Sequence, residues 1–186
     1  MELAKRGTLL VIDLNGVLLD RRGQELRGRP ALGRWGKRYA YERPHAAEFV
    51  CWAASMGWVV GLWTSAQRKN AEPMARAVLG DAYACVRFLY TQDECEVVGN
   101  VTGRCTFRKP LARLWREGLG LPHRTVLLDD GKEKICQGEE DNALICPQYD
   151  AGAGDDEALA PDGWVRTALA EIMASADVRN AIVQAY

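Results

Sequence analysis

Short apolar runs, separated by longer mixed segments, recur along the whole chain. Four of these runs are rich in branched side chains, and they cover residues 8–14, 58–65, 125–130 and 142–147. Runs of this length and composition are typical of strands that are buried on both faces of a parallel sheet. We therefore predict four parallel strands at these positions.

The segments between these strands have helical patterns. We predict helices over residues 45–57, 70–80, 109–120 and 163–186. Pro44 opens the first helix, Gly57 is placed to cap it, and the last helix should break near Ser175 and Asp177. The alternation of strands and helices predicts an α/β fold with a doubly wound, Rossmann-like parallel sheet.

Three segments depart from this alternation. Residues 20–43 carry eight basic side chains against three acidic ones and are rich in glycine, which favours an irregular, solvated loop. Residues 86–107 alternate strand-like pieces with Gly99, Asn100 and Gly103, which predicts a small β insertion. Residues 151–163 form an acidic connector. No insertion is long enough to form a large cap domain, so we expect a single domain over residues 1–186.

Composition and charge exclude several classes of protein. The chain has 186 residues, 48% of them hydrophobic and 26% charged, which is typical of one globular domain. Its 24 basic and 25 acidic side chains argue against a chain-wide nucleic-acid surface. No apolar run approaches the ~18 residues of a membrane span. The run before Asp13 is too short for a secretory signal. We therefore expect no membrane and no direct nucleic-acid partner.

The six cysteines have no spacing that suggests a zinc site or a redox pair. They are Cys51, Cys85, Cys95, Cys105, Cys136 and Cys146. In the absence of a secretory signal, we interpret them as free, buried thiols. This favours an intracellular, reducing compartment, with the nucleus or the cytoplasm ahead of an organelle.

Polar residues follow three of the predicted strands. They are Asp13, the pair Thr64 and Ser65, and the pair Asp129 and Asp130. In open α/β sheets, ligands bind beyond the carboxyl ends of the strands, so these side chains should share one edge. Lys109, at the start of a predicted helix, could reach the same edge. Carboxylates, hydroxyls and a lysine suit Mg²⁺-assisted phosphoryl transfer with an aspartate as nucleophile.

Four motifs of the chain resemble, in order, those of haloacid dehalogenase (HAD)-type hydrolases. They are DLNGVLLD (13–20), WTSAQRKNAEP (63–73), the lysine of RKPLARLW (108–115) and LLDDGKEK (127–134). The pieces YERPHAAEFV, FLYTQDEC, DNALICPQYD and ADVRNAI are similar to the NLI-interacting-factor-like branch. That branch contains small phosphatases of the RNA polymerase II C-terminal domain. The resemblance covers nearly the whole chain.

The resemblance implies a role for each matched residue. Asp13 would be the nucleophile and a ligand of Mg²⁺, and Asp129 or Asp130 would be a further ligand. The main-chain carbonyl of Asn15 would complete the protein ligands. Thr64 would donate a hydrogen bond to the phosphoryl group.

A lysine should neutralise the charge of the bound phosphoryl group, a role of the oxyanion-hole type. The resemblance assigns this role to Lys109, although Arg108 is a close rival in the same motif. The basic stretch 20–43 would border the site, where it could hold a phosphorylated or acidic protein segment.

Asn15 departs from the family pattern, which usually has an aspartate there as general acid and base. A carboxamide neither donates nor accepts the proton, and losing this step typically costs ~10²–10⁴-fold in rate. The cost should be largest for alkyl leaving groups such as phosphoserine.

Two functions follow from these features. One is a Mg²⁺-dependent phosphatase acting on phosphoserine or phosphothreonine in proteins, slowed by Asn15. The other is a catalytically silent binding module or a subunit of a larger protein assembly. A phosphotransferase or dehalogenase-like reaction is a third hypothesis, which no feature of the sequence favours.

Overall fold

The centre of the molecule is a five-stranded parallel sheet, described by a computed structural model that covers residues 7–99 and 105–184. Its strands are β1 (Thr8–Ile12), β5 (Trp58–Trp63), β6 (Val86–Tyr90), β9 (Thr125–Asp129) and β10 (Ala143–Ile145). Their order in the sheet is β10-β9-β1-β5-β6, and every neighbouring pair is parallel. The α/β fold and the four predicted strands are confirmed. Asp13 and Thr64 directly follow β1 and β5, and Asp129 is the last residue of β9, so all three lie at the carboxyl ends of the strands.

The fifth strand corrects one prediction, because residues 86–90 do not belong to the β insertion. Strand β6 pairs with β5, and Gly61 lies opposite Phe88. A Cβ atom on Gly61 would lie 2.2 Å from the Phe88 ring, so any larger residue there would have to push the ring away. The insertion is therefore only the hairpin of β7 (Glu96–Val98) and β8 (Thr106–Arg108). The predicted turn residues Asn100 and Gly103 lie outside the described residues.

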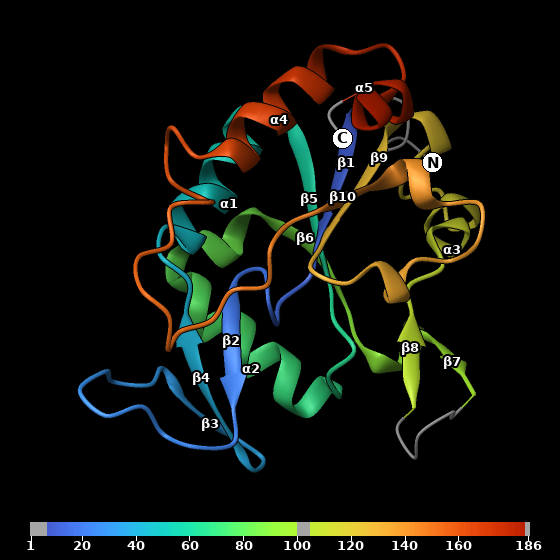
Figure 1. The fold of residues 1–186 in the computed structure, drawn as a ribbon. Coiled ribbons are helices and arrows are strands. Elements are labelled where there is room, and N and C mark those ends of the chain that lie inside the picture. Colours follow the sequence, from blue (N-terminus) through green and yellow to red (C-terminus); the bar gives the residue numbers. More distant parts are fainter. Residues whose placement is uncertain (1–6, 100–104, 185–186) are drawn as a thin grey trace.

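Helices cover both faces of the sheet (Figure 1). They are α1 (Ala46–Ser55), α2 (Arg68–Leu79), α3 (Leu111–Arg116), α4 (Trp164–Ala174) and α5 (Val178–Gln184). The 3₁₀ helices are η2 (Gly80–Cys85), η3 (Gln92–Glu94), η4 (Pro122–Arg124), η5 (Lys132–Lys134) and η6 (Glu140–Asn142). Side chains alternate along β1, so that Leu10 and Ile12 pack with α1, α2 and α4 while Leu9 and Val11 pack with α3. The predicted helix break at Ser175 is confirmed, since this residue ends α4.

Residues 20–43 are not the irregular loop that their composition suggested. They form most of a second, antiparallel sheet of β2 (Leu19–Arg22), β3 (Gly33–Trp35) and β4 (Arg38–Glu42), in the order β2-β4-β3. Buried Tyr41 anchors this small sheet, because its hydroxyl accepts the Leu26 N–H at 2.7 Å. The small sheet and the β7–β8 hairpin project from the same end of the molecule (Figure 1).

The cysteines differ in part from the prediction. All six lie within the described residues, where they form no disulfide. Only Cys146 is buried, however, and Cys51 and Cys105 are exposed, so the expectation of buried thiols is wrong for most of them. Among the helices of residues 7–99 and 105–184, none combines the length and the apolar character needed to cross a membrane.

Candidate active site

The candidate site lies at the carboxyl-end edge of the central strands. Asp13 follows β1 directly, and its backbone N–H donates to the Leu128 carbonyl at 3.0 Å. Asp129 is the last residue of β9, and Thr64 follows β5. All three side chains are buried. Parallel strands that end at one edge thus bring together residues that are far apart in the sequence.

Three carboxylates converge at this edge. Asp13, Asp129 and Asp130 each offer a ligand oxygen, and these oxygens lie within 4.8 Å of one another. Gly16 makes this possible, because its φ of +90° is strained for other residues and a Cβ atom there would lie 2.0 Å from the Asp130 Oδ2. The glycine of the DLNG motif therefore lets the loop after β1 pass close to the Asp130 carboxylate.

Two lysines lie among these carboxylates. The Lys109 Nζ is 3.0 Å from Asp13 Oδ1 and 2.6 Å from Asp129 Oδ2, and the residue is 1% exposed. The Lys134 Nζ is 2.7 Å from Asp13 Oδ2, 2.9 Å from Asp129 Oδ1 and 2.5 Å from Asp130 Oδ1. The Lys109 N–H also donates to the Lys134 carbonyl at 2.8 Å, so the two lysines are held together through the backbone.

Sequence reasoning missed Lys134. Its spacing of four residues after Asp130, inside the acidic fourth motif, was a usable signal. Arg108, the rival of Lys109, lies on β8, and its Nε is buried with no hydrogen-bond partner among the described residues. The structure therefore brings Lys109 to the carboxylates.

The pKa values of the carboxylates shift in opposite directions, although lysines lie beside both Asp129 and Asp130. Burial raises the pKa of Asp129, but the ammonium groups of Lys109 and Lys134 outweigh it and hold this pKa below its usual value. Burial raises the pKa of Asp130 to about 6 against the pull of Lys134, and the charge of Asp13 adds to the rise. Burial lowers the pKa of Lys134, but the three carboxylates outweigh it and the net shift is upward. Lys134 is therefore charged at neutral pH.

Asn15 and Thr64 lie near the carboxylates without bonding to them. Asn15 bridges to Leu19 in the turn after Asp13, and its Oδ1 is buried with no hydrogen-bond partner in the described part of the chain. The Thr64 hydroxyl accepts the Ala66 N–H at 3.3 Å. Within residues 7–99 and 105–184, neither side chain forms a hydrogen bond to Asp13, Asp129 or Asp130.

The oxygen donors fit a divalent cation. Mg²⁺ is typically held by one or two carboxylates, with phosphate and water oxygens as its other ligands. Asp13, Asp129 and Asp130 offer such oxygens. The buried, unpartnered Oδ1 of Asn15 is a further oxygen at the same loop. The Lys134 ammonium, however, contacts one oxygen of each carboxylate, so a cation and Lys134 need the same groups.

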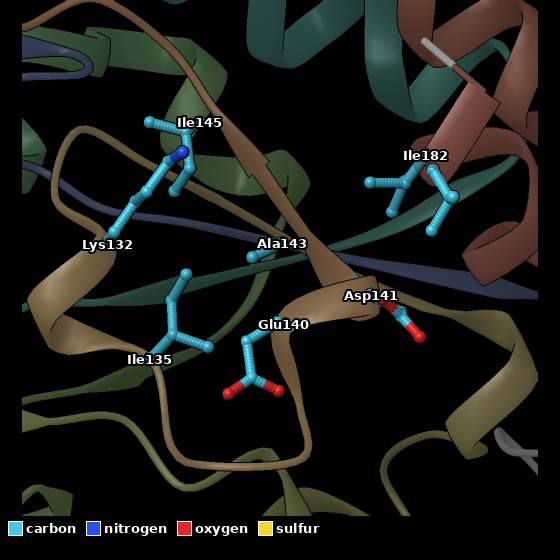
Figure 2. Close-up of a pocket in the computed structure, with 8 residues that line it drawn as sticks. Lys132, Ile135, Glu140, Asp141, Ala143, Ile145 and Ile182 are labelled. Atoms are coloured by element: carbon cyan, nitrogen blue, oxygen red, sulfur yellow. The ribbon is translucent and has the colours of Figure 1, made fainter. Parts of the chain in front are cut away.

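A separate cavity of about 450 Å³ lies beside β10. Figure 2 shows its lining, which includes Ile135, Ala143 and Ile182. None of the predicted site residues lines it. This cavity is therefore distinct from the candidate site.

Comparisons with known proteins agree with the fold. The family described as NLI interacting factor-like phosphatase matches residues 8–179. A search of curated proteins gives no significant match. One similar solved structure is that of Fcp1, an essential RNA polymerase II CTD phosphatase, with 16% identity, a TM-score of 0.56, and coverage of 80% of this chain and 44% of that one.

Two further structures share the fold. Fission yeast Fcp1 bound to beryllium fluoride is 17% identical, with a TM-score of 0.56 and coverage of 96% of this chain and 54% of that one. A predicted phosphoglycolate phosphatase from Haemophilus somnus is 10% identical, with a TM-score of 0.51 and coverage of 84% and 92%. The chain thus spans about half the length of the two Fcp1 structures.

The fold and the edge of converging acids define the class as HAD-like. Within that class, the chain belongs to the NLI interacting factor-like phosphatase family.

Proposed function

We propose that this chain is a Mg²⁺-dependent phosphatase that acts on phosphoserine or phosphothreonine in proteins, at a rate limited by Asn15. The observation that carries the proposal is the placement of Asp13. Its buried carboxylate lies between the Lys109 and Lys134 ammonium groups, beside Asp129 and Asp130. A buried carboxylate beside the fixed Lys109 ammonium is suited to attack a phosphate, whose negative charge Lys109 would balance.

Each residue would have a defined task in this reaction. An oxygen of Asp13 would attack phosphorus and form an aspartyl-phosphate as the bond from phosphorus to the serine or threonine oxygen breaks, and water would later hydrolyse the aspartyl-phosphate. Lys109 would balance the charge of the phosphoryl oxygens. The protein ligands of Mg²⁺ would be Asp13, Asp129 or Asp130, and the main-chain carbonyl of Asn15. Bound Mg²⁺ would supply Lewis-acid stabilisation of the phosphoryl charge. The carboxamide of Asn15 can give no proton to the leaving alkoxide and take none from the attacking water.

The surroundings of the site favour a protein substrate. In the described ranges, the additions to the central sheet are the small sheet β2-β4-β3 and the hairpin β7–β8, which are too small to form a cap domain. The small sheet exposes the basic side chains Arg34, Lys37 and Arg38. It projects from the same end of the molecule as the β7–β8 hairpin (Figure 1). Their charge would attract a phosphorylated or acidic protein segment, including one that belongs to a larger assembly.

A silent binding module is the second candidate. Two observations favour it, the carboxamide at Asn15 and the Lys134 ammonium among the acids. Both lower the negative charge that would attract a metal. A module of this kind would hold a phosphorylated or acidic segment without cleaving it.

Hydrolysis by the native protein, Asn15→Asp and Asp13→Asn tests the proposal, with an aryl phosphate and a phosphoserine peptide at saturating Mg²⁺. We expect slow native turnover and an inactive Asp13→Asn protein. On the peptide, Asn15→Asp should be faster by about 10²–10⁴-fold. The gain should be smaller on the aryl phosphate, because its leaving group needs no proton. If neither the native protein nor Asn15→Asp hydrolyses either substrate, the result contradicts the phosphatase proposal and favours a binding module.

Intact mass is the necessary control, because deamidation at Asn15–Gly16 would create the aspartate and imitate the variant. The folded loop opposes this reaction. It requires the Gly16 nitrogen to attack the Asn15 side chain, and that N–H donates to the Leu19 carbonyl at 2.7 Å. An unchanged mass therefore assigns any native turnover to the asparagine form.

A further inference from the structure

Lys134 occupies the position among the carboxylates that a cation would need. Its Nζ contacts one oxygen from each of Asp13, Asp129 and Asp130, at 2.7, 2.9 and 2.5 Å. Lys109 contacts the opposite oxygens of Asp13 and Asp129 only. The two lysines are therefore not equivalent, since Lys134 alone of the pair joins all three acids.

An ammonium group and a divalent cation cannot share these oxygens. Mg²⁺ binds oxygen ligands at about 2.0–2.1 Å, so it would lie in the space that the Lys134 nitrogen fills. The two positive charges would also repel each other at short range. Metal binding therefore requires the Lys134 ammonium to leave.

The two lysines differ in how easily they could leave. The Lys109 side chain is 1% exposed, whereas the Lys134 side chain is 18% exposed. Lys134 also ends the short 3₁₀ turn η5, and its side chain is already partly exposed there. Of the two ammonium groups, the one of Lys134 can move into water with little rearrangement of the fold.

We propose that Lys134 is a built-in competitor of the metal. In the metal-free protein its ammonium holds the three carboxylates together, and a divalent cation binds only by displacing it toward solvent. This inference rests on the metal site of the proposed function. Lys134 would thereby raise the metal concentration at which the site fills, while keeping the acids in place before it does.

Calorimetric titration with Mg²⁺ and Mn²⁺ tests the competition directly. The proteins are the native chain, Lys134→Met, and the matched control Lys132→Met, whose exposed lysine lies on the same turn. We expect Lys134→Met to bind each metal at least about tenfold more tightly than the native protein. This factor follows if Lys134 is displaced in a tenth of the native molecules or fewer, because only those molecules can bind the metal. Lys132→Met should bind as the native protein does, and Asp129→Asn should lose binding.

A second measurement uses the native protein and needs no stable variant. Acylation of lysines by a succinimidyl ester, read by mass spectrometry, reports which ammonium groups reach solvent. Saturating Mg²⁺ should increase labelling of Lys134 relative to Lys132. Unchanged labelling of Lys134 under metal saturation would overturn the inference even if Lys134→Met does not fold.

The outcomes separate this inference from the proposed function. Equal or weaker metal binding by Lys134→Met overturns the competition and leaves the phosphatase proposal standing. If neither the native protein nor Lys134→Met binds a divalent metal, both the inference and the metal site fail. Tighter binding by Lys134→Met alone, with increased Lys134 labelling, supports the inference.

Discussion

Arg43 joins the loop of the candidate site to the acidic connector, and its removal is the sharpest test of how the site is held. Its guanidinium is fully buried and bonds Asp156 twice, at 2.8 Å through Nε and 2.8 Å through Nη2. Its Nη1 donates to the Val17 carbonyl at 3.2 Å, and its Nη2 donates to the Pro147 carbonyl at 3.3 Å. We predict that Arg43→Met destabilises the fold and displaces the loop after Asp13.

The magnitude follows from what the variant leaves behind. Breaking a buried charge pair typically costs about 3–5 kcal/mol, because the remaining charge has no partner. The Asp156 side chain is 22% exposed, so water can partly solvate it after the change. The Val17 and Pro147 carbonyls also lose a donor, at about 1 kcal/mol each. We therefore expect about 3 kcal/mol or somewhat more, measured as a change in the free energy of unfolding.

Urea unfolding followed by tryptophan fluorescence is the assay. The midpoint should fall at unchanged slope, since only stability changes. Arg38→Met is the matched control, because Arg38 is exposed on the adjoining strand β4 and should change stability by less than about 0.5 kcal/mol. If Arg43→Met lowers the free energy of unfolding by less than about 1 kcal/mol, the usual net contribution of one hydrogen bond, Arg43 does not stabilise the fold through its buried contacts as reasoned.

Three further predictions concern the frame of the site. Glu139→Ala should cost about 1–3 kcal/mol in urea unfolding, far more than Glu140→Ala, because the buried Glu139 carboxylate accepts the first two N–H groups of α3 at 2.8 Å each. Gly61→Ala should cost about 1–3 kcal/mol by pushing the Phe88 ring away from β5, and a native-like unfolding midpoint would contradict this packing. The raised pKa of Asp130, about 6 against an ordinary 3.8, gives a pH dependence. The native state holds this proton more tightly than the unfolded state, so the stability contribution is complete below pH 3.8 and is lost as the pH rises through about 6. In the absence of metal, the urea midpoint of Asp130→Asn should therefore vary less with pH than that of the native protein. An unchanged pH profile would contradict the raised pKa of Asp130.

The central strands were predictable because burial on both faces leaves a strong signal in the sequence. Strand β6 was not, since none of its residues is fully buried. Such a strand looks like a piece of an antiparallel insertion. Its true place depends on the close packing of Phe88 against Gly61, which only the folded chain reveals.

The convergence of Asp13, Asp129 and Lys109 could be predicted, because the ends of parallel strands meet at one edge and the motifs occur in order. The environment of Arg43 could not, because it depends on Pro147 and Asp156, more than a hundred residues away. A count of basic residues treats such a buried arginine like its solvated neighbours. The charges of the stretch were visible in the sequence, but their partners were not.

Two features of the site would slow the reaction for different physical reasons. Asn15 removes a proton donor, so its effect persists when the metal is saturating and depends on the basicity of the leaving group. Lys134 takes oxygens from the metal, so its effect vanishes at high metal concentration and is the same for every leaving group. If Asn15→Asp raises a weak activity at saturating Mg²⁺, the native enzyme therefore lacks a proton donor. If Lys134→Met raises the activity only at low Mg²⁺, Lys134 occupies the position of the cation in the native enzyme. The two variants together distinguish a slowed enzyme from a binding module, in which neither change produces turnover.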